Sequence, residues 1–373
     1  MGIQNKYAIV GVGHSRLGSL PGNSRLGLIA EAVKNALDDA GLLPKDVDGI
    51  LTHNNITYTH HSRVGQLLGI NTRFGNTGHS GGATNAKNVA MACMAIEAGL
   101  ADTVVVAYGE TERQTGGGEG REMEFGPEFG YFGAIATHAF GCTRHMHQYG
   151  TTHEQLGHIA TAFRGAAARN PHAQQRTPIT LEDYLNSRWV VWPFHLLDCC
   201  QVTDGAAAAI ITTAERARTL RQPPIYIMGF SQFQNSRGWF VDDHMTELAA
   251  KESADAAYRM AGVGPKDIDT AQIYDCFTYT VLATLEDYGF AKKGEGGPWV
   301  ATGALELGGE LPTNTSGGQL SEGHTEGALQ IVEGVRQLRH AYGPDRQVKD
   351  AEIALVTGHG GNTVCHASLI LRR

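Results

Sequence analysis

Four residues in the second half of the chain have side chains that could move protons. Tyr274 and Cys276 lie in "YDCF", His324 lies in "EGHTEG" and His359 lies in "TGHGGN". A histidine at the start of a helix feels the positive end of the helix dipole, which favours the neutral imidazole. A neutral imidazole can accept a proton or donate a hydrogen bond to an oxyanion. We therefore predict acid–base chemistry here, with the alternative that His324 only caps its turn.

The stretch "NTGHSGGATNAKNVAMACMAIEAG", residues 76–99, is typical of a loop that presents a nucleophile at the start of a helix. Its Gly78–Gly82 segment matches the GxSxG pattern, which in hydrolases places a serine on a strained strand-to-helix turn. His79 and Ser80 are the reactive side chains, and no cysteine occurs before Cys93, well inside the predicted helix. The preceding strand is weak and broken by glycine, so a Ser80 nucleophile is one alternative among several.

Three other motifs lack the spacing that their chemistry needs. "GVGHSRLG" begins like a dinucleotide-binding loop, but Arg16 takes the place of the third glycine. "HEQLGH" resembles a zinc-protease helix, but His153 and His158 are five residues apart rather than four and miss a common face. "RHMHQ", from Arg144, is read as ordinary polar residues on a helix. We therefore predict no metal site.

The elements that must position these residues occur twice along the chain. "AGLLPKDVDGI" begins at Ala40 and "AGVGPKDIDTA" begins at Ala261, and both follow an apolar helical pattern and lead into an apolar strand. A glycine-rich segment, a helix and a strand then follow in both copies, with the strands "ADTVVVAYGE" and "AEIALVTGHGG". Elements repeated in the same order indicate two homologous α/β halves. We place the halves at residues 1–225 and 226–373.

Predicted strands such as "YAIVGVG", "TVVVAYG" and "IALVTG" are short, continuous and rich in β-branched residues. They are bounded by glycine and alternate with helices, which is typical of a sheet covered on both faces. The region at about residues 112–200 is less regular, and we predict a loop domain inserted in the first half over a site. Its glycine-rich stretch at 114–133 is either part of this cover or a solvated excursion.

Composition excludes several classes of function. Charged residues make up 18% and apolar residues 42% of the 373 residues, which is typical of a folded chain with a large core. A net charge of −8 without a run of lysine or arginine argues against a nucleic-acid-binding surface. The six cysteines fit neither a disulfide framework nor zinc-binding pairs, and no apolar stretch is long enough to span a membrane. We predict a cytoplasmic protein with no nucleic-acid partner and no membrane span.

Longer motifs, spread over essentially the whole chain, carry a family resemblance. They are "YGTTHEQLGHIATAFRGAAARNPHAQ", "PITLEDYLNSRWVVWPFHLLDCCQVTDGAAAAIITTAERAR", "YDCFTYTVLATLEDYGF", "NTSGGQLSEGHTEGA" and "RQV" near Arg346. Together they resemble the thiolase superfamily, specifically its sterol-carrier-protein thiolase or lipid-transfer-protein type. The resemblance implies an α/β fold, a five-layer αβαβα sandwich of two duplicated halves with an inserted loop domain. It also implies a homodimer that acts on acyl-CoA, with a coenzyme A thioester as substrate and no permanently bound cofactor.

The resemblance carries over to the acid–base residues unevenly. His324 matches the family's GHP-type histidine, although Thr325 replaces the proline that follows it. Cys276 matches the cysteine of the family's HDCF motif, which is a candidate acid–base group in members without the C-terminal cysteine. Tyr274 replaces the histidine of that motif. The position of the family's C-terminal cysteine falls near His359.

The family's nucleophilic cysteine has no counterpart in this chain. Counted back from Gly99, the glycine before the next strand, its position falls on Gly82, and a small shift would place Ser80 or His79 there. No registration supplies a cysteine. The predicted substrate-binding residues are Gly82, Ser80, His79, Asn314 and Gly361.

Ordinary thiolase chemistry is therefore not expected, because Claisen thiolysis proceeds through an acyl-enzyme on a thiolate. The remaining groups suit a retro-aldol reaction: a base removes the hydroxyl proton of a 3-hydroxyacyl-CoA, a ketone or aldehyde leaves, and an acid protonates the enolate. Tyr274, Cys276 and His324 are the available acid–base groups. Our main hypothesis is an acyl-CoA carbon–carbon lyase that acts on a steroid or aromatic side chain without a covalent intermediate.

Two alternatives stay open beside this hypothesis. One is a non-catalytic acyl-CoA-binding, lipid-binding or scaffold subunit, which would need the pocket but neither His324 nor Cys276. The other is an acyltransferase or hydrolase that uses Ser80. The likeness to cysteine-less steroid side-chain aldolases also implies a small partner subunit with an OB-fold and a zinc ribbon.

Overall fold

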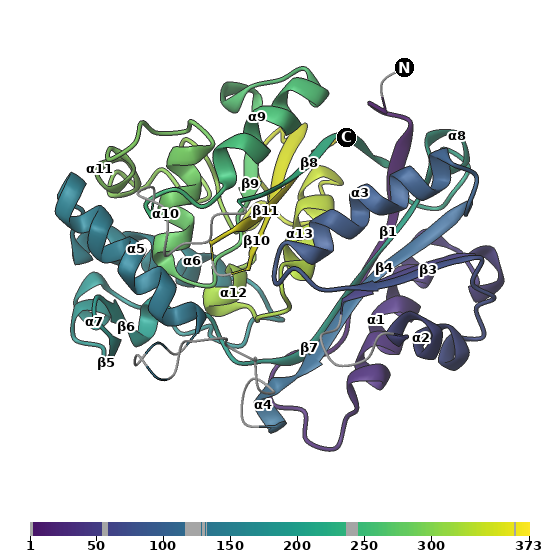
Figure 1. The fold of residues 1–373 in the computed structure, drawn as a ribbon, viewed down its shortest axis with the longest axis horizontal. Helices are drawn as coiled ribbons and strands as arrows, with labels where there is room; N and C mark the ends of the chain where they lie inside the picture. The colour runs from purple at the N-terminus through teal and green to yellow at the C-terminus, as the bar shows by residue number, and fades with distance from the viewer. Residues whose placement is uncertain are drawn as a thin grey trace.

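The computed structural model describes residues 3–53, 59–115, 128, 131, 133–235, 245–361 and 363–373. The first half alternates strands and helices and ends with a long strand that returns to the centre of the sheet (Figure 1). Its elements are β1 (Tyr7–His14), α1 (Arg25–Ala40), β2 (Gly49–His53), α2 (His60–Leu68), β3 (Phe74–Gly78), α3 (Thr84–Glu97), β4 (Thr103–Thr111) and β7 (Asp204–Thr213).

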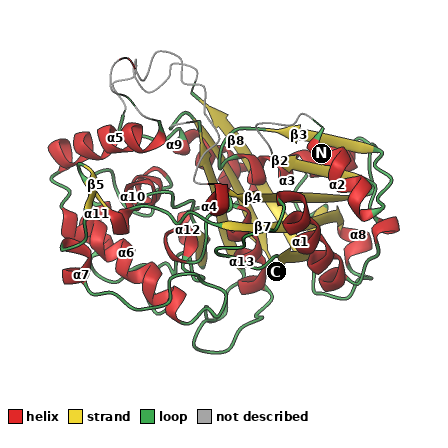
Figure 2. Ribbon diagram, turned by 90° about the horizontal axis from the view of Figure 1, so that it is seen from below, coloured by secondary structure: helices red, strands yellow, loops and turns green. Residues whose placement is uncertain are grey.

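Between β4 and β7 the chain leaves the sheet and forms a mainly helical region at one end of the molecule (Figure 2). This is the region where we predicted an inserted loop domain at residues 112–200, and its boundaries stay a prediction. Most of the glycine-rich stretch at 114–133 lies outside the described residues. The elements are α4 (Glu112–Thr115), α5 (Ala134–Tyr149), α6 (His153–Ala168), α7 (Leu181–Leu185), β5 (Trp189–Val191) and β6 (Phe194–His195).

The second half follows a short connecting helix, α8 (Ala214–Ala217). Its first strand begins at Ile225, and the division of the chain at residue 225 stays a prediction. In the described part of the chain, no helix has both the length and the hydropathy that a membrane span requires. The elements are β8 (Ile225–Gln234), α9 (Ala250–Ala261), β9 (Thr270–Gln272), α10 (Thr278–Asp287), α11 (Gly296–Val300), α12 (Gly318–Ser321), α13 (Ala328–Leu338), β10 (Ile353–Gly360) and β11 (Cys365–Arg372).

The repeated "PKD" motif has the same structure in both halves. Helices α1 and α9 each end at a glycine in the left-handed conformation, Gly41 with φ 73° and Gly262 with φ 72°. Glycine adopts this conformation without the steric cost that a Cβ would add. A single 3₁₀ turn follows in each half, at Pro44–Asp46 and Pro265–Asp267, and leads into a strand. The sequence repeat is therefore a structural repeat.

The strands form one nine-stranded sheet in the order β3-β2-β4-β7-β1-β8-β11-β10-β9. Each half contributes antiparallel pairs at the centre, β1–β7 and β8–β11, and parallel pairs further out, β2–β4 and β9–β10. The halves meet where β1 and β8 pair through Ala8 with Tyr226 and Ile9 with Ile225. The strand order is thus nearly mirrored about this seam.

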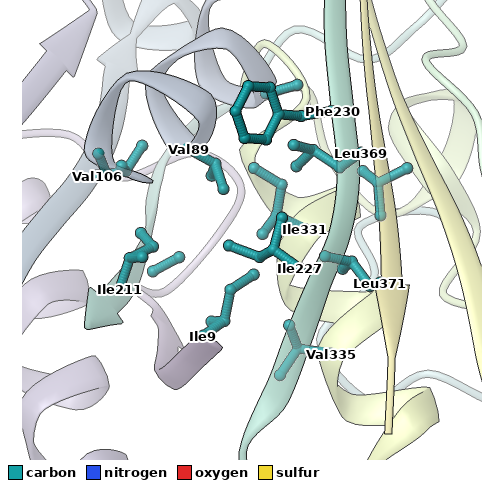
Figure 3. Packing of buried hydrophobic residues seen from close by; sticks show 14 of the residues in the cluster. Ile9, Val89, Val106, Ile211, Ile227, Phe230, Ile331, Val335, Leu369 and Leu371 are labelled. Carbon is teal, nitrogen blue, oxygen red and sulfur yellow. The ribbon is translucent and has the colours of Figure 1, made fainter. Parts of the chain in front are cut away.

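Helices α3 and α13 lie between the two halves and form the middle layer (Figure 1). Their apolar side chains pack with strand residues of both halves, as Val89, Ile331, Val106 and Leu369 do in Figure 3. Helix α1 packs on the other face of the first half, and α9 and α10 pack on that of the second. Each layer buries its apolar side against the next, and the predicted five-layer α/β sandwich is confirmed.

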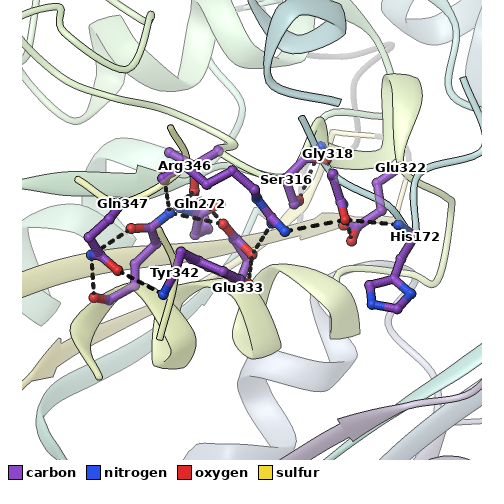
Figure 4. A network of polar contacts seen from close by, with 12 residues as sticks. His172, Gln272, Ser316, Gly318, Glu322, Glu333, Tyr342, Arg346 and Gln347 are labelled. Atoms are coloured by element: carbon purple, nitrogen blue, oxygen red, sulfur yellow. Dashed lines mark hydrogen bonds and ion pairs between the residues drawn. The ribbon is translucent and has the colours of Figure 1, made fainter. Parts of the chain in front are cut away.

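A buried polar network fixes the loop that leads to His324 (Figure 4). Asn170, just after α6, donates through Nδ2 to Glu322 Oε1 and to the Ser316 carbonyl oxygen, both at 2.9 Å. Arg346 forms an ion pair with Glu333, with Nη2 and Oε2 3.2 Å apart. Because buried polar groups are costly unless they are paired, such a network holds one backbone arrangement. It ties the inserted region to the loop of the second half.

Candidate active site

A cavity of about 500 Å³ lies where loops of the two halves meet the inserted region. The first half contributes the turn before α3, the inserted region contributes α5, and the second half contributes the loops after β9, before α13 and after β10. The polar or backbone groups in its wall include those of His79, Ser80, Gly82, Glu112, His138, Gln201, Tyr274, Cys276, His324, Glu326, His359 and Gly361.

The structure places every predicted site residue except Asn314 in the wall of this cavity. Asn314 is fully buried, donates through Nδ2 to the Ile273 carbonyl oxygen at 2.8 Å and accepts from the Ile273 amide at 2.7 Å. Both of its side-chain groups are thus used to hold the backbone next to Tyr274. Asn314 therefore supports the backbone beside the cavity, and its contact with substrate stays a prediction.

Gly82, the position assigned to the missing cysteine, has no room for a side chain. A Cβ there would lie 2.0 Å from Cε2 and 2.4 Å from the hydroxyl oxygen of Tyr274. Atoms in a close-packed interior do not approach so closely, so the tyrosine ring fills the space that a cysteine would need. Glycine at position 82 and tyrosine at position 274 therefore depend on each other sterically.

The Tyr274 hydroxyl lies between a carboxylate and an imidazole. It donates to Glu326 Oε2 at 2.9 Å, and His324 Nε2 is 3.5 Å away. Burial, followed by the Glu326 charge, raises the pKa of Tyr274 well above its ordinary value. Tyr274 is therefore a neutral phenol at rest, and it can exchange protons with two neighbours.

His324 is paired with a carboxylate, contrary to the neutral imidazole that we predicted from a helix dipole. Its Nδ1 lies 2.8 Å from Glu110 Oε1, and Glu110 Oε2 accepts a hydrogen bond from Tyr108 at 2.7 Å. Burial acts to lower the pKa of His324, but the charges of Glu110, Cys200 and Glu326 and the hydrogen bond to Glu110 together raise it well above its ordinary value, while burial raises the pKa of Glu110 to about 7. Moreover, α13 begins only at Ala328, so the histidine precedes the helix rather than capping it.

Sequence reasoning missed the three carboxylates around His324 and Tyr274. Glu110 is near the end of β4, Glu112 follows that strand, and Glu326 lies two residues after His324 within the quoted "EGHTEG". Glu110, Glu112 and His324 offer ligand atoms within 4.8 Å of one another, a spacing that could hold a metal ion. However, His324 and Glu110 already balance each other's charge through their hydrogen bond.

The cavity wall also carries uncharged groups, and the centroid of the His359 ring is 6.3 Å from that of Tyr274. Cys276 Sγ lies 3.3 Å from Thr280 Oγ1 and 3.9 Å from His138 Nε2. Burial raises the pKa of Cys276 to about 12, so it is a thiol that can donate a proton rather than a thiolate. His359 Nε2 lies 3.0 Å from His138 Nε2, and burial lowers the pKa of both rings. No motif in the sequence pointed to His138.

Ser80 has a basic neighbour that the sequence reasoning did not identify. Its Oγ accepts a hydrogen bond from Lys87 Nζ at 2.5 Å. Lys87 is in the first turns of α3, within the same quoted stretch, and burial lowers its pKa. The GxSxG turn therefore contains a serine–lysine pair next to the cavity.

Known proteins match this chain over most of its length. Residues 232–373 match the family described as thiolase C-terminal domain-like. The chain is 38% identical over 362 residues to the steroid side-chain-cleaving aldolase of Thermomonospora curvata, covering 89% of this chain and 90% of that protein. It is 39% identical over 358 residues to the 17-hydroxy-3-oxo-4-pregnene-20-carboxyl-CoA lyase of Mycobacterium tuberculosis, covering 90% and 92%. The chain belongs to the thiolase superfamily.

A solved structure, the Ltp2-ChsH2(DUF35) aldolase, has the same thiolase-like fold. It superposes with a TM-score of 0.92 at 36% identity, over 100% of this chain and 99% of that one. The predicted membership of the thiolase superfamily is confirmed. Within this superfamily fold, the present chain combines Gly82 with Tyr274 and surrounds the tyrosine with carboxylates.

Proposed function

We propose that this chain is an acyl-CoA carbon–carbon lyase that cleaves a 3-hydroxyacyl-CoA by a retro-aldol reaction. One observation carries the proposal: the Tyr274 ring occupies the space beside Gly82. This ring removes the position that could accept an acyl group and puts an acid–base hydroxyl in its place. The names of the two relatives, an aldolase and a CoA lyase, support the same reaction type.

The charged side of the cavity would start the reaction. Tyr274 passes its hydroxyl proton to Glu326 and accepts the proton of the substrate's 3-hydroxyl group. The electron pair of that O–H bond forms the carbonyl of the leaving ketone or aldehyde. The bond between C2 and C3 breaks, and its electrons pass to the thioester as an enolate.

The enolate needs a positive partner and then a proton. The His324–Glu110 pair keeps His324 protonated, and His324 donates a hydrogen bond to the enolate oxygen through its other ring nitrogen. Cys276, a neutral thiol in the cavity wall, gives its proton to C2. The products are a ketone or aldehyde and a shorter acyl-CoA, and no residue is acylated.

The finer assignments rest on the family and on the relatives' names. We propose a steroid or aromatic side chain as the acyl group, because both relatives are named for steroid substrates. We also propose a homodimer in the cytoplasm, with acyl-CoA as the only substrate and no permanent cofactor. A small OB-fold, zinc-ribbon subunit is proposed because the similar aldolase structure has a second component, ChsH2(DUF35).

The test is a cleavage assay, run with and without such a partner subunit. We expect 3-hydroxyacyl-CoA thioesters with steroid or aromatic side chains to give a carbonyl product and a shorter acyl-CoA, detected by mass spectrometry. The matched control is the 3-deoxy thioester, which has no hydroxyl proton to remove and should stay intact. The proposal is refuted if no steroid, aromatic or aliphatic 3-hydroxyacyl-CoA is cleaved.

A second candidate function is favoured by the Ser80–Lys87 pair. Lys87 in its neutral form could take the Ser80 proton, and Ser80 could then attack a thioester as a hydrolase or acyltransferase. A fluorophosphonate probe distinguishes the two functions. Labelling of Ser80, with an acyl group on it during turnover, would favour the second candidate over the lyase.

A further inference from the structure

The neutral side of the cavity continues into the protein as a chain of polar side chains. His138 and His359 line the cavity, and His366 lies directly across from His359 in the β10–β11 ladder. His366 Nε2 lies 3.0 Å from the Tyr288 hydroxyl oxygen, which is hydrogen-bonded to Ser368 Oγ. His366, Tyr288 and Ser368 are buried and do not contact solvent directly.

The hydroxyl groups of Ser253 and Ser231 extend this row of polar side chains to the surface. Ser368 Oγ is 2.7 Å from Ser253 Oγ, which is 2.7 Å from Ser231 Oγ. Ser253 and Ser368 are fully buried, whereas Ser231 is partly exposed where β8 leaves the core. Hydroxyl groups both donate and accept, so each can pass a proton along the row.

The hydrogen bonds fix the tautomers at the cavity end. His138 Nδ1 lies 2.7 Å from the Ala134 carbonyl oxygen, which can only accept, so Nδ1 carries the proton. Burial lowers the pKa of His138 to about 4, so the ring is neutral and its Nε2 is an acceptor. His359 must then donate through Nε2, which leaves its Nδ1 as a bare acceptor.

Only one link in the row is open. His359 Nδ1 and His366 Nδ1 are both buried without a hydrogen-bond partner among the described residues, and the two rings have centroids 5.8 Å apart. Buried polar groups of this kind are usually satisfied by an ordered water molecule. One water that bonds to both nitrogens would close the row from the cavity to Ser231.

We propose that this row is a proton wire that restores the proton of Cys276 after each turnover, an inference that rests on the proposed lyase function. Cys276 becomes a thiolate when it protonates the enolate carbon. His359 then passes its Nε2 proton to His138 Nε2, and His138 gives that proton to the Cys276 sulfur.

The proton lost by His359 is replaced at Nδ1 by the bridging water, and the ring must then turn about its Cβ–Cγ bond to present the new N–H towards His138 before the next turnover. His366, Tyr288, Ser368, Ser253 and Ser231 each hand on one proton, and the last comes from solvent. No electron transfer or co-reactant is needed. The wire is useful because the hydroxyl proton of the substrate is held by Tyr274 and Glu326, and Cys276 regains its own proton without drawing on that pair.

The decisive measurement separates the first turnover from later ones, using the variants Tyr288→Phe and Ser253→Ala. The first turnover uses the proton already on Cys276, so its rate should stay within about twofold of the unaltered protein, whereas steady-state turnover should fall about tenfold or more. The matched control is Tyr258→Phe, whose hydroxyl donates to the Tyr288 carbonyl oxygen at 3.3 Å and lies off the wire. It should leave both rates unchanged.

Equal losses in both phases would mean that Tyr288 and Ser253 only support the fold, and an unchanged steady state would mean that Cys276 is reprotonated from the cavity; either result overturns the wire. A high-resolution crystal structure tests the bridging water independently of activity. Density for a water between His359 and His366 is expected, and an empty gap there would overturn the wire even if the lyase reaction is demonstrated. Failure of the unaltered protein to cleave any substrate would instead refute the proposed function.

Discussion

The two sides of the cavity treat charge in opposite ways. On one side, Tyr274 and His324 are surrounded by Glu326 and Glu110, and the pair with Glu110 keeps the imidazole charged despite burial. In the neutral group, His138 contacts both His359 and Cys276, and burial keeps both rings neutral. The same side-chain type thus takes opposite protonation states within one cavity.

This difference shows that the partner, rather than burial alone, decides the state of a buried histidine. Burial disfavours the imidazolium in both groups, and at His324 the hydrogen bond to Glu110 and the neighbouring charges together reverse that effect. A charged side suits the removal of a hydroxyl proton and the stabilisation of an enolate oxygen. A neutral thiol suits delivery of a proton to carbon, because burial and the charges of Asp275 and Glu326 keep Cys276 protonated until the enolate forms.

Among the variants of the charged residues, Tyr274→Phe should have the largest effect on catalysis. The change removes one hydroxyl from the ring beside Gly82 and keeps the ring that fills that space. We expect kcat of the cleavage reaction to fall about 10³-fold, the usual scale for losing a positioned acid–base group. Steady-state rates with a 3-hydroxyacyl-CoA measure it, and Tyr279→Phe, whose hydroxyl has only a 3.5 Å contact with the Met245 carbonyl oxygen, is the control. A loss below about tenfold would assign the base role to another group.

The next change, His324→Gln, removes the positive charge and keeps a hydrogen-bond donor. We expect kcat to fall about 10²-fold, because a charged donor to the enolate oxygen is replaced by a neutral one. Glu110→Gln should give a similar loss by releasing His324 from its partner. If Glu110→Gln leaves the rate unchanged while His324→Gln lowers it, the carboxylate has no part in holding the charge.

Gly82→Ala tests the steric dependence between positions 82 and 274. The added methyl group would overlap the Tyr274 ring, and overpacking of this kind costs about 1–3 kcal/mol of unfolding free energy. Chemical denaturation of the single variants and of Gly82→Ala with Tyr274→Ala measures the coupling. The penalty should shrink markedly in the double variant, and simple additivity would show that the ring can move aside.

The buried neutral histidines His138 and His366 should make the stability of the protein depend on pH. Burial lowers the pKa of His366 to about 3 and that of His138 to about 4. As pH falls from about 6.5 towards 4, these rings become protonated in the unfolded chain but stay neutral in the folded chain. The unfolding free energy therefore decreases by about 1.4 kcal/mol per pH unit for each ring. His324 has the opposite sign: its stabilising effect is full below about pH 6.5 and is lost as pH rises through its raised pKa.

Urea denaturation between pH 4 and 6.5 checks this dependence with His366→Asn. The variant should have a shallower slope than the unaltered protein by about the contribution of one ring. Replacement of the exposed His147 by asparagine is the control and should not change the slope. An unchanged slope in His366→Asn would mean that His366 is protonated in the folded state.

The sequence was sufficient for the features that are encoded locally. The paired "PKD" segments predicted two related halves because each codes for the same glycine-ended helix and 3₁₀ turn. Comparison with the family's motifs also located Tyr274, Cys276, His324 and His359, and all four line one cavity. Each of these inferences depends only on residues that are close together in the sequence.

The sequence was insufficient where a residue's state depends on a distant partner. Glu110 is 214 residues from His324 in the chain, and without it the helix-dipole argument gave the wrong protonation state. His138 comes from the inserted region, 221 residues before His359. The supporting role of Asn314 was missed for the same reason, because its bonds to the Ile273 backbone follow from the tertiary fold. Contacts of this kind leave no spacing pattern to read.

The smallest effect is expected for Lys87→Met. This variant tests whether residues of the turn before α3 take part in the proton transfers. Lys87 is half-buried and donates to Ser80 Oγ, and the variant keeps most of its volume while removing the donor. If Tyr274 and Cys276 carry the proton transfers, Lys87→Met should change kcat of cleavage by about twofold or less, since an interaction outside the reacting groups contributes little to the transition state. Ser80→Ala should behave in the same way. A loss approaching that of Tyr274→Phe in both variants would instead place the Ser80–Lys87 pair at the reacting centre, and the division of the cavity into one charged and one neutral side would then be incomplete.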